Sequence, residues 1–79
     1  MKNYILQHSL HSIGHALMRL RYARNEKQQT VAQATGISIA VLSKIECGKY
    51  PHVTIECLLK LTEYYAVTLA DLMDPEVRA

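Results

Sequence analysis

The chain has 79 residues, 49% of them hydrophobic, and it contains neither Trp nor Phe. A chain of this length forms one domain with a small core, which excludes an enzyme that needs a large, dry pocket. No apolar run approaches the ~20 residues that span a bilayer, and polar residues interrupt the apolar N-terminal stretch, so we expect a cytoplasmic protein without a membrane segment.

The net charge of +2 is distributed unevenly along the chain. Residues 1–49 carry seven Lys and Arg against two Glu, a net charge of +5, whereas residues 50–79 carry two basic against five acidic residues, a net charge of −3. A polarised molecule of this kind can present its basic half to phosphate groups while the acidic half disfavours unspecific binding.

Apolar residues recur at helical spacing over residues 12–24 and predict a first helix, with Ser9 as an alternative start. Asn25 follows, a residue that tolerates the left-handed conformation and can end a helix. Residues 1–11 are also rich in apolar side chains, and three alternatives fit them. They can extend the first helix, pack back on the domain, or form an arm that meets a second chain.

Two short helices are predicted at residues 27–35 and 38–47, hinged at Gly36. Gly36 can take positive φ and end the first of them in a left-handed cap, and Ser38 then stands at the N-cap position of the second. Gly48 ends that second helix. The pair is too closely spaced to be anything but a tight two-helix unit.

The second half of the chain predicts two further helices. Pro51 marks a loop, and Thr54 is the expected N-cap of a fourth helix. Thr68 is the expected N-cap of a short fifth helix, paired with Asp71 in a capping-box-like arrangement, and Asp74–Pro75 ends it. We expect the fourth helix to bury Ile55, Leu58, Leu59, Leu61 and Tyr65. Because no segment alternates as a long strand should, the prediction is an all-α, compact five-helix domain.

The helix expected at residues 38–47 has two distinct faces. The inward face of the two-helix unit consists of Val31, Ile37, Leu42 and Ile45. The outward face is small and carries no acid, and it consists of Ser38, Ile39, Ala40, Ser43 and Lys44. A face of this kind suits the floor of a DNA major groove.

An ordered set of residues over about residues 13–73 resembles the lambda-repressor/Cro-like (xenobiotic-response-element type) helix-turn-helix family of DNA-binding transcriptional regulators. The set is Ile13-Gly14, Leu17, Leu20-Arg21, Gln28, Val31-Ala32, Gly36, Ser38, Leu42-Ser43, Ile45-Glu46, Gly48-Lys49, residues 58–61, residues 66–69 and Leu72. The resemblance implies a DNA-binding domain at residues 12–74, with residues 1–11 as an arm or helix extension and residues 75–79 as a short tail.

The resemblance also implies roles for individual residues. Those near DNA would be Lys27, Gln28, Ser38, Ile39, Ala40, Ser43, Lys44 and Lys49. Of these, residues 38–40 would meet base edges, Ser43 and Lys44 bases or phosphates, and Lys49 a phosphate. Gln28 would bond a phosphate or brace the third helix. Arg21 and Glu46 would form a buried ion pair that ties the third helix to the scaffold.

Three positions depart from the family pattern. Ile39 stands where many relatives have a polar side chain, and its methyl groups favour thymine methyls, or it belongs to a surface that faces a protein partner. Lys27 replaces the usual Ser or Thr N-cap, which is worth about 1 kcal/mol. Glu26 stands where an apolar residue is usual, and nothing in the sequence explains it. Arg19 and Arg24 are expected to be solvated.

A homodimer is expected, and the best interface candidates are Met73 and Val77. Tyr65, Ile5 and Leu6 are further candidates, whereas Val67, Leu69 and Leu72 are assigned to the core. For His8, His11 and His15, which share one side of a helix, a solvated polar face is favoured over a metal or pH-sensing cluster. Cys47 and Cys57 are expected to be free thiols, and neither a metal nor a cofactor is expected.

The chain contains no glycine-rich phosphate loop and no acid–base pair at meaningful spacing, so we expect no enzyme. The leading hypothesis is a sequence-specific DNA-binding transcriptional regulator, a repressor that occupies an inverted-repeat operator on double-stranded DNA as a homodimer. The alternative is a protein-interaction module or an antitoxin that binds a toxin or another protein partner, with DNA binding secondary or lost.

Overall fold

Five helices and no strand make up the part of the chain that the computed structural model describes, residues 4–73. They are α1 (Tyr4–Ala23), α2 (Gln28–Thr35), α3 (Ile39–Glu46), α4 (Ile55–Tyr65) and α5 (Leu69–Met73). The predicted all-α fold with five helices is confirmed. Over the same residues, none of the helices has the length and apolarity to cross a membrane.

Of the three alternatives for the N-terminal segment, the structure contains the extension of the first helix, over the described residues 4–11. The helix begins at Tyr4, not at Ser12 or Ser9, and runs for 20 residues to Ala23. No glycine or proline precedes either serine, and the helix continues through both of them. Residues 4–11 are therefore continuous with α1. Asn25 follows α1 in the left-handed conformation, with φ of 59°, as expected.

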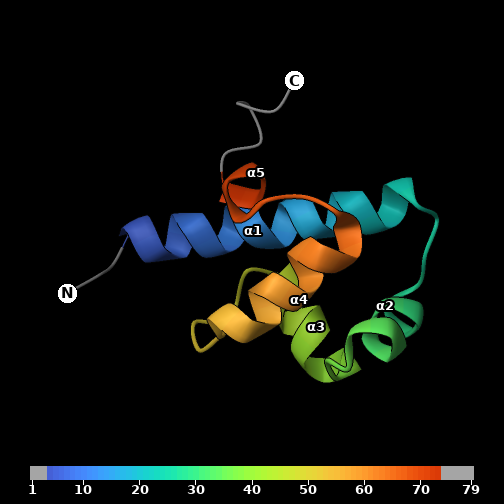
Figure 1. The fold of residues 1–79 in the computed structure, drawn as a ribbon. Coiled ribbons are helices and arrows are strands. Elements are labelled where there is room, and N and C mark those ends of the chain that lie inside the picture. Colours follow the sequence, from blue (N-terminus) through green and yellow to red (C-terminus); the bar gives the residue numbers. More distant parts are fainter. Residues whose placement is uncertain (1–3, 74–79) are drawn as a thin grey trace.

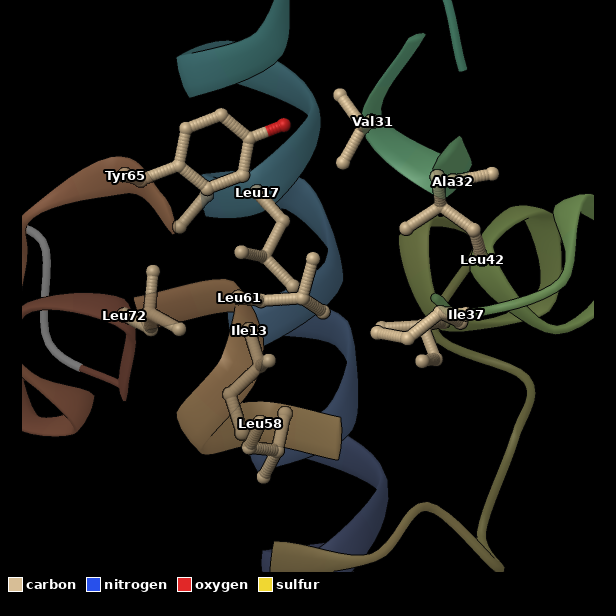
Figure 2. Packing of buried hydrophobic residues seen from close by; sticks show 12 residues of the cluster. Ile13, Leu17, Val31, Ala32, Ile37, Leu42, Leu58, Leu61, Tyr65 and Leu72 are labelled. Atoms are coloured by element: carbon tan, nitrogen blue, oxygen red, sulfur yellow. The ribbon is translucent and has the colours of Figure 1, made fainter. Parts of the chain in front are cut away.

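The core is formed where side chains of all five helices meet (Figure 2). The largest fully buried side chains are Leu17, Val31, Leu42, Leu61 and Leu72, one from each helix. Helix α1 lies between α5 on one side and α3 on the other (Figure 1). Because α1 contributes to both contacts, it is the central element of the domain.

Helix α4 buries a narrower face than predicted. Its buried residues are Leu58, Leu61, Thr62 and Tyr65, at the i, i+3, i+4, i+7 spacing of one helix face. Ile55 and Leu59 lie off this face and are 61% and 54% exposed, so the prediction that they are buried is wrong. Tyr65 is only 6% exposed, so its assignment to a dimer interface is wrong as well. Its ring belongs to the core (Figure 2).

The turn between α2 and α3 is fixed by side-chain and backbone hydrogen bonds. Gly36 has φ of 78° and donates its N–H to the Ala32 carbonyl at 2.9 Å. The Ser38 hydroxyl accepts the N–H of Val41 at 3.2 Å, as an N-cap does. The predicted helix-turn-helix geometry is confirmed, and it fixes the direction in which α3 leaves α2.

The predicted caps of α4 and α5 are also present. The Thr54 hydroxyl accepts the N–H of Cys57 at 3.1 Å. At the start of α5, the Thr68 hydroxyl accepts the N–H of Asp71 at 3.1 Å, and the Asp71 carboxylate accepts the N–H of Thr68 at 3.0 Å. This reciprocal pair is the capping box that the sequence predicts. The helix stop assigned to Asp74–Pro75 lies outside the described residues.

Gly14 is the point where α1 crosses α3. A Cβ atom at this position would overlap the carbonyl oxygen of Ile45 and lie 2.8 Å from that of Glu46. Both are backbone atoms of α3, so a larger residue would force the two helices apart. The close crossing brings the C-terminal turn of α3 directly onto the middle of α1.

We expect Gly14→Ala to lower the free energy of unfolding by about 2 kcal/mol or more, because overpacking outweighs the gain in helix propensity. Urea denaturation followed by circular dichroism measures this change. Gln7→Ala, on the exposed surface of the same helix, is the control and should change little. Equal or greater stability of the Gly14 variant would contradict the tight crossing.

Candidate nucleic-acid interface

The first turn of α3 presents small and uncharged side chains to solvent. Ser38 and Ala40 are exposed, and Ile39 is 46% exposed. One turn later Lys44 is exposed and Ser43 is half-buried. On the opposite side of the same helix, Leu42, Ile45 and Glu46 are buried. The structure thus separates the two faces of α3 as the sequence predicts, and the exposed one contains no carboxylate.

Arg21 and Glu46 hold α3 against α1. The Arg21 Nε and Nη2 atoms donate to the two carboxylate oxygens of Glu46, each at 2.8 Å, and both residues are buried. This two-pronged geometry is the strongest form of an arginine–carboxylate contact. The hydrogen bond to Glu46 is the main cause that raises the pKa of Arg21. The predicted ion pair is confirmed, and the third nitrogen, Nη1, donates to the Glu26 carbonyl at 3.0 Å.

Gln28 joins the same cluster from the start of α2. Its Nε2 amide donates to Oε1 of Glu46 at 2.9 Å, and the side chain is half-buried. Of the two roles that the resemblance implied, the structure contains the bracing contact. Arg21, Gln28 and Glu46 therefore connect α1, α2 and α3, and we refer to these three residues as the clamp.

The three lysines assigned to the interface are exposed and stand at helix ends. Lys27 is the N-cap residue of α2, with no side-chain cap, as its sequence predicts. Lys44 lies in the last turn of α3, and Lys49 follows the helix, its N–H donating to the Lys44 carbonyl at 3.1 Å. The positive charges thus occupy both ends of the helix-turn-helix unit.

Two glutamines of α2 lie beside α3 and were not among the predicted site residues. Gln29 and Gln33 line a shallow surface depression together with Ser38 and Ile39. Both are exposed. Their spacing of four residues, which places them on one helix face, is the sequence signal that would have identified them.

Glu26 has a structural partner that the sequence did not reveal. Its Oε2 atom accepts the hydroxyl of Tyr64 in α4 at 2.7 Å, and this hydrogen bond raises the pKa of Tyr64. Arg24 is exposed, as expected, and it also contacts the same helix. It donates to the Tyr64 carbonyl at 3.1 Å and lies 5.0 and 5.4 Å from the ring centres of Tyr64 and Tyr65. The loop after α1 is therefore fixed to α4.

The remaining residues predicted for the dimer interface lie on different helices or outside the described residues. Met73 of α5 is 44% exposed, Ile5 and Leu6 of α1 are 81% and 40% exposed, and Val77 lies outside the described residues. Within residues 4–73, no group of three or more His, Cys, Asp or Glu could hold a metal ion. Cys47 and Cys57 are free thiols.

We expect Glu46→Ala to lower the free energy of unfolding by about 3 kcal/mol, because it leaves the buried Arg21 charge without its partner. DNA binding should weaken as a consequence of the looser domain. Thermal denaturation measures the first effect. Glu56→Ala, which removes a glutamate from an exposed ion pair with Lys60, is the control. A Glu46 variant that melts normally but has lost DNA binding would contradict the structural role.

Comparison with known protein families agrees with this geometry. Searches of curated proteins and of solved structures gave no match. A family model described as a helix-turn-helix domain matches residues 12–74, which includes all of α2 to α5 and the clamp. The chain therefore belongs to the helix-turn-helix domain family, a Cro/C1-type family of DNA-binding domains.

Proposed function

We propose that the protein is a sequence-specific transcriptional regulator that inserts the first turn of α3 into the DNA major groove. The observation that carries the proposal is the exposed, acid-free turn at residues 38–40, held in place by the Ser38 N-cap and the clamp. A rigid helix that presents small side chains can approach base edges closely, because nothing on it has to move aside.

Base recognition combines apolar and amide contacts. The half-exposed Ile39 side chain offers methyl groups to thymine C5-methyls. Gln29 and Gln33, which share a surface depression with it, supply amides of the type that pairs with adenine. The preferred sites therefore contain A·T pairs. Ser38, Ala40 and Ser43 complete the set of residues near bases or phosphates.

Phosphate contacts come from Lys27, Lys44 and Lys49. Lys27 and Gln28 stand at the N-terminus of α2, where the helix dipole also favours a phosphate. Gln28 can accept this second role while its amide remains bonded to Glu46, because its N–H₂ group has two hydrogens. These contacts position the domain on the duplex without reading sequence.

The protein acts as a homodimer on an inverted repeat, with half-sites about one helical turn apart, and represses transcription by occupying the operator. The exposed Met73 on α5 and Ile5 on the N-terminal part of α1 support this assembly. Because α5 packs against α1, an interface built on Met73 lies beside α1. Figure 1 shows α5 resting on α1.

Selection of bound sites from a random DNA pool tests the function, followed by a salt titration of the best site. We expect a palindromic, A·T-containing site and an affinity that falls steeply with salt. Ser43→Ala with Lys44→Ala should weaken binding about tenfold or more and reduce the salt slope by about one. Lys60→Ala is the matched control, because it removes one positive charge from the exposed surface of α4.

Failure to enrich any sequence would contradict the proposal. It would instead favour the alternative in which the fold serves a protein partner, for which the exposed Ile39 would be the contact. Equal loss of affinity in the Lys60 control would show that net charge alone, and not α3, determines binding.

We expect Met73→Asp to give a folded monomer with at least tenfold weaker operator binding, because dimerisation doubles the phosphate contacts of a single domain. Sedimentation velocity and binding to the selected site measure both effects. Ile55→Asp, at an apolar position on α4 that is more exposed than Met73, is the control and should leave the dimer intact. A dimer that persists in the Met73 variant would remove α5 from the interface.

A further inference from the structure

One exposed face of α1 carries a continuous stripe of aromatic and basic side chains. It consists of Tyr4, His8, His11, His15, Arg19 and Tyr22, at spacings of three and four residues, and all six are exposed. Helix α1 contains no Asp or Glu at any position. The two tyrosines at its ends are 75% and 62% exposed, and the imidazoles of His11 and His15 stack with ring centres 6.3 Å apart. We refer to these six residues as the α1 stripe.

The α1 stripe adjoins the end of α3 through a close backbone contact. A Cβ atom at Gly48 would lie 2.9 Å from the His11 Cα, so the chain after α3 packs directly on α1 at His11. Gly48 precedes Lys49, one of the three lysines assigned to phosphates. His11, inside the stripe, therefore lies beside the proposed DNA contact, and the stripe extends along α1 in both directions from His11.

The groups around the imidazoles leave them available to an external anion. On the α3 side, the Glu46 carboxylate is taken up by Arg21 and Gln28, and Cys47 and Lys49 flank Gly48. On the α5 side, the Asp71 carboxylate accepts the Thr68 N–H, and on α1 itself Arg19 adds a further positive charge. Within residues 4–73, neither of the two ion pairs, Arg21–Glu46 and Glu56–Lys60, involves a histidine.

We propose that the α1 stripe is a second DNA-contacting surface, which binds the phosphate backbone next to the site occupied by α3. This inference rests on the proposed function. Basic side chains interleaved with exposed aromatic rings, without acids, are typical of surfaces that follow a nucleic-acid backbone. Histidine is the residue type whose charge responds to pH near neutrality, so a change of pH is the means of testing this contact.

The test uses the full chain and a fluorescent duplex of mixed sequence, with anisotropy measured at about pH 6 and pH 7.5 and at constant ionic strength. We expect the protein to bind about tenfold more tightly at the lower pH, with a salt slope that is steeper by about two. The variant with His8→Gln, His11→Gln and His15→Gln should lose this difference. It should keep the affinity that the protein has at pH 7.5.

A rescue variant and a control make the test specific. The variant with His8→Arg, His11→Arg and His15→Arg carries permanent charge and should bind tightly at both pH values, with no pH dependence. His52→Gln, in the loop after α3, removes the fourth histidine and should leave the pH dependence in place. Circular dichroism at both pH values confirms that the variants are folded.

Three results would overturn the inference. If the glutamine variant retains the full pH dependence, the stripe does not contact DNA, while the proposed function stands. If the three substitutions change the sedimentation of the free protein and not its affinity for DNA, the stripe is a contact between protein chains. If the unmodified protein binds no duplex at either pH, both the stripe and the proposed function fail.

Discussion

The carboxylate of Glu46 is the point at which three helices are tied together. It lies on α3 and accepts hydrogen bonds from Arg21 of α1 and Gln28 of α2. Such a buried charged cluster is not itself strong evidence of net stability, because its desolvation opposes its attraction. Its effect is geometric, since α3 can satisfy this carboxylate in only one orientation. The direction of the exposed turn at residues 38–40 follows from that constraint.

The close crossing of α1 and α3 makes this clamp possible. Gly14 allows the backbone of α1 to touch the carbonyls of Ile45 and Glu46. Arg21 stands two turns further along α1 and therefore reaches the same end of α3. Because the clamp and the crossing occupy one end of α3, the other end is left free to project into solvent. The apolar core then needs only to support this arrangement, which a domain of 79 residues can do with one large buried side chain from each helix.

Around the helix-turn-helix unit, the basic side chains are exposed, whereas the carboxylates are bonded to other parts of the protein. Lys27, Lys44 and Lys49 are exposed around the helix-turn-helix unit, while the acidic residues near it are engaged. Glu46 belongs to the clamp, and Glu26 accepts the hydroxyl of Tyr64. Burial raises the pKa of the neighbouring Tyr65 to about 12. A surface without free carboxylates attracts phosphate at a modest overall charge, because local and not net charge sets the field close to the protein.

The sequence by itself determined the features that depend on residues close together in the chain. Helix periodicity, the glycine at the turn and the caps at Ser38, Thr54 and Thr68 are local, and so the helix-turn-helix unit could be predicted. Arg21 and Glu46 were paired through the family resemblance. Only the tertiary structure decided how far α1 extends, which side of α4 is buried, and what Glu26 and Arg24 do. These outcomes depend on contacts between residues about 40 positions apart, such as Arg24 with Tyr64, and local propensity contains no information about them. The α1 stripe illustrates both: its spacing is visible in the sequence, but its place beside Gly48 is set by the packing of α1 on the end of α3.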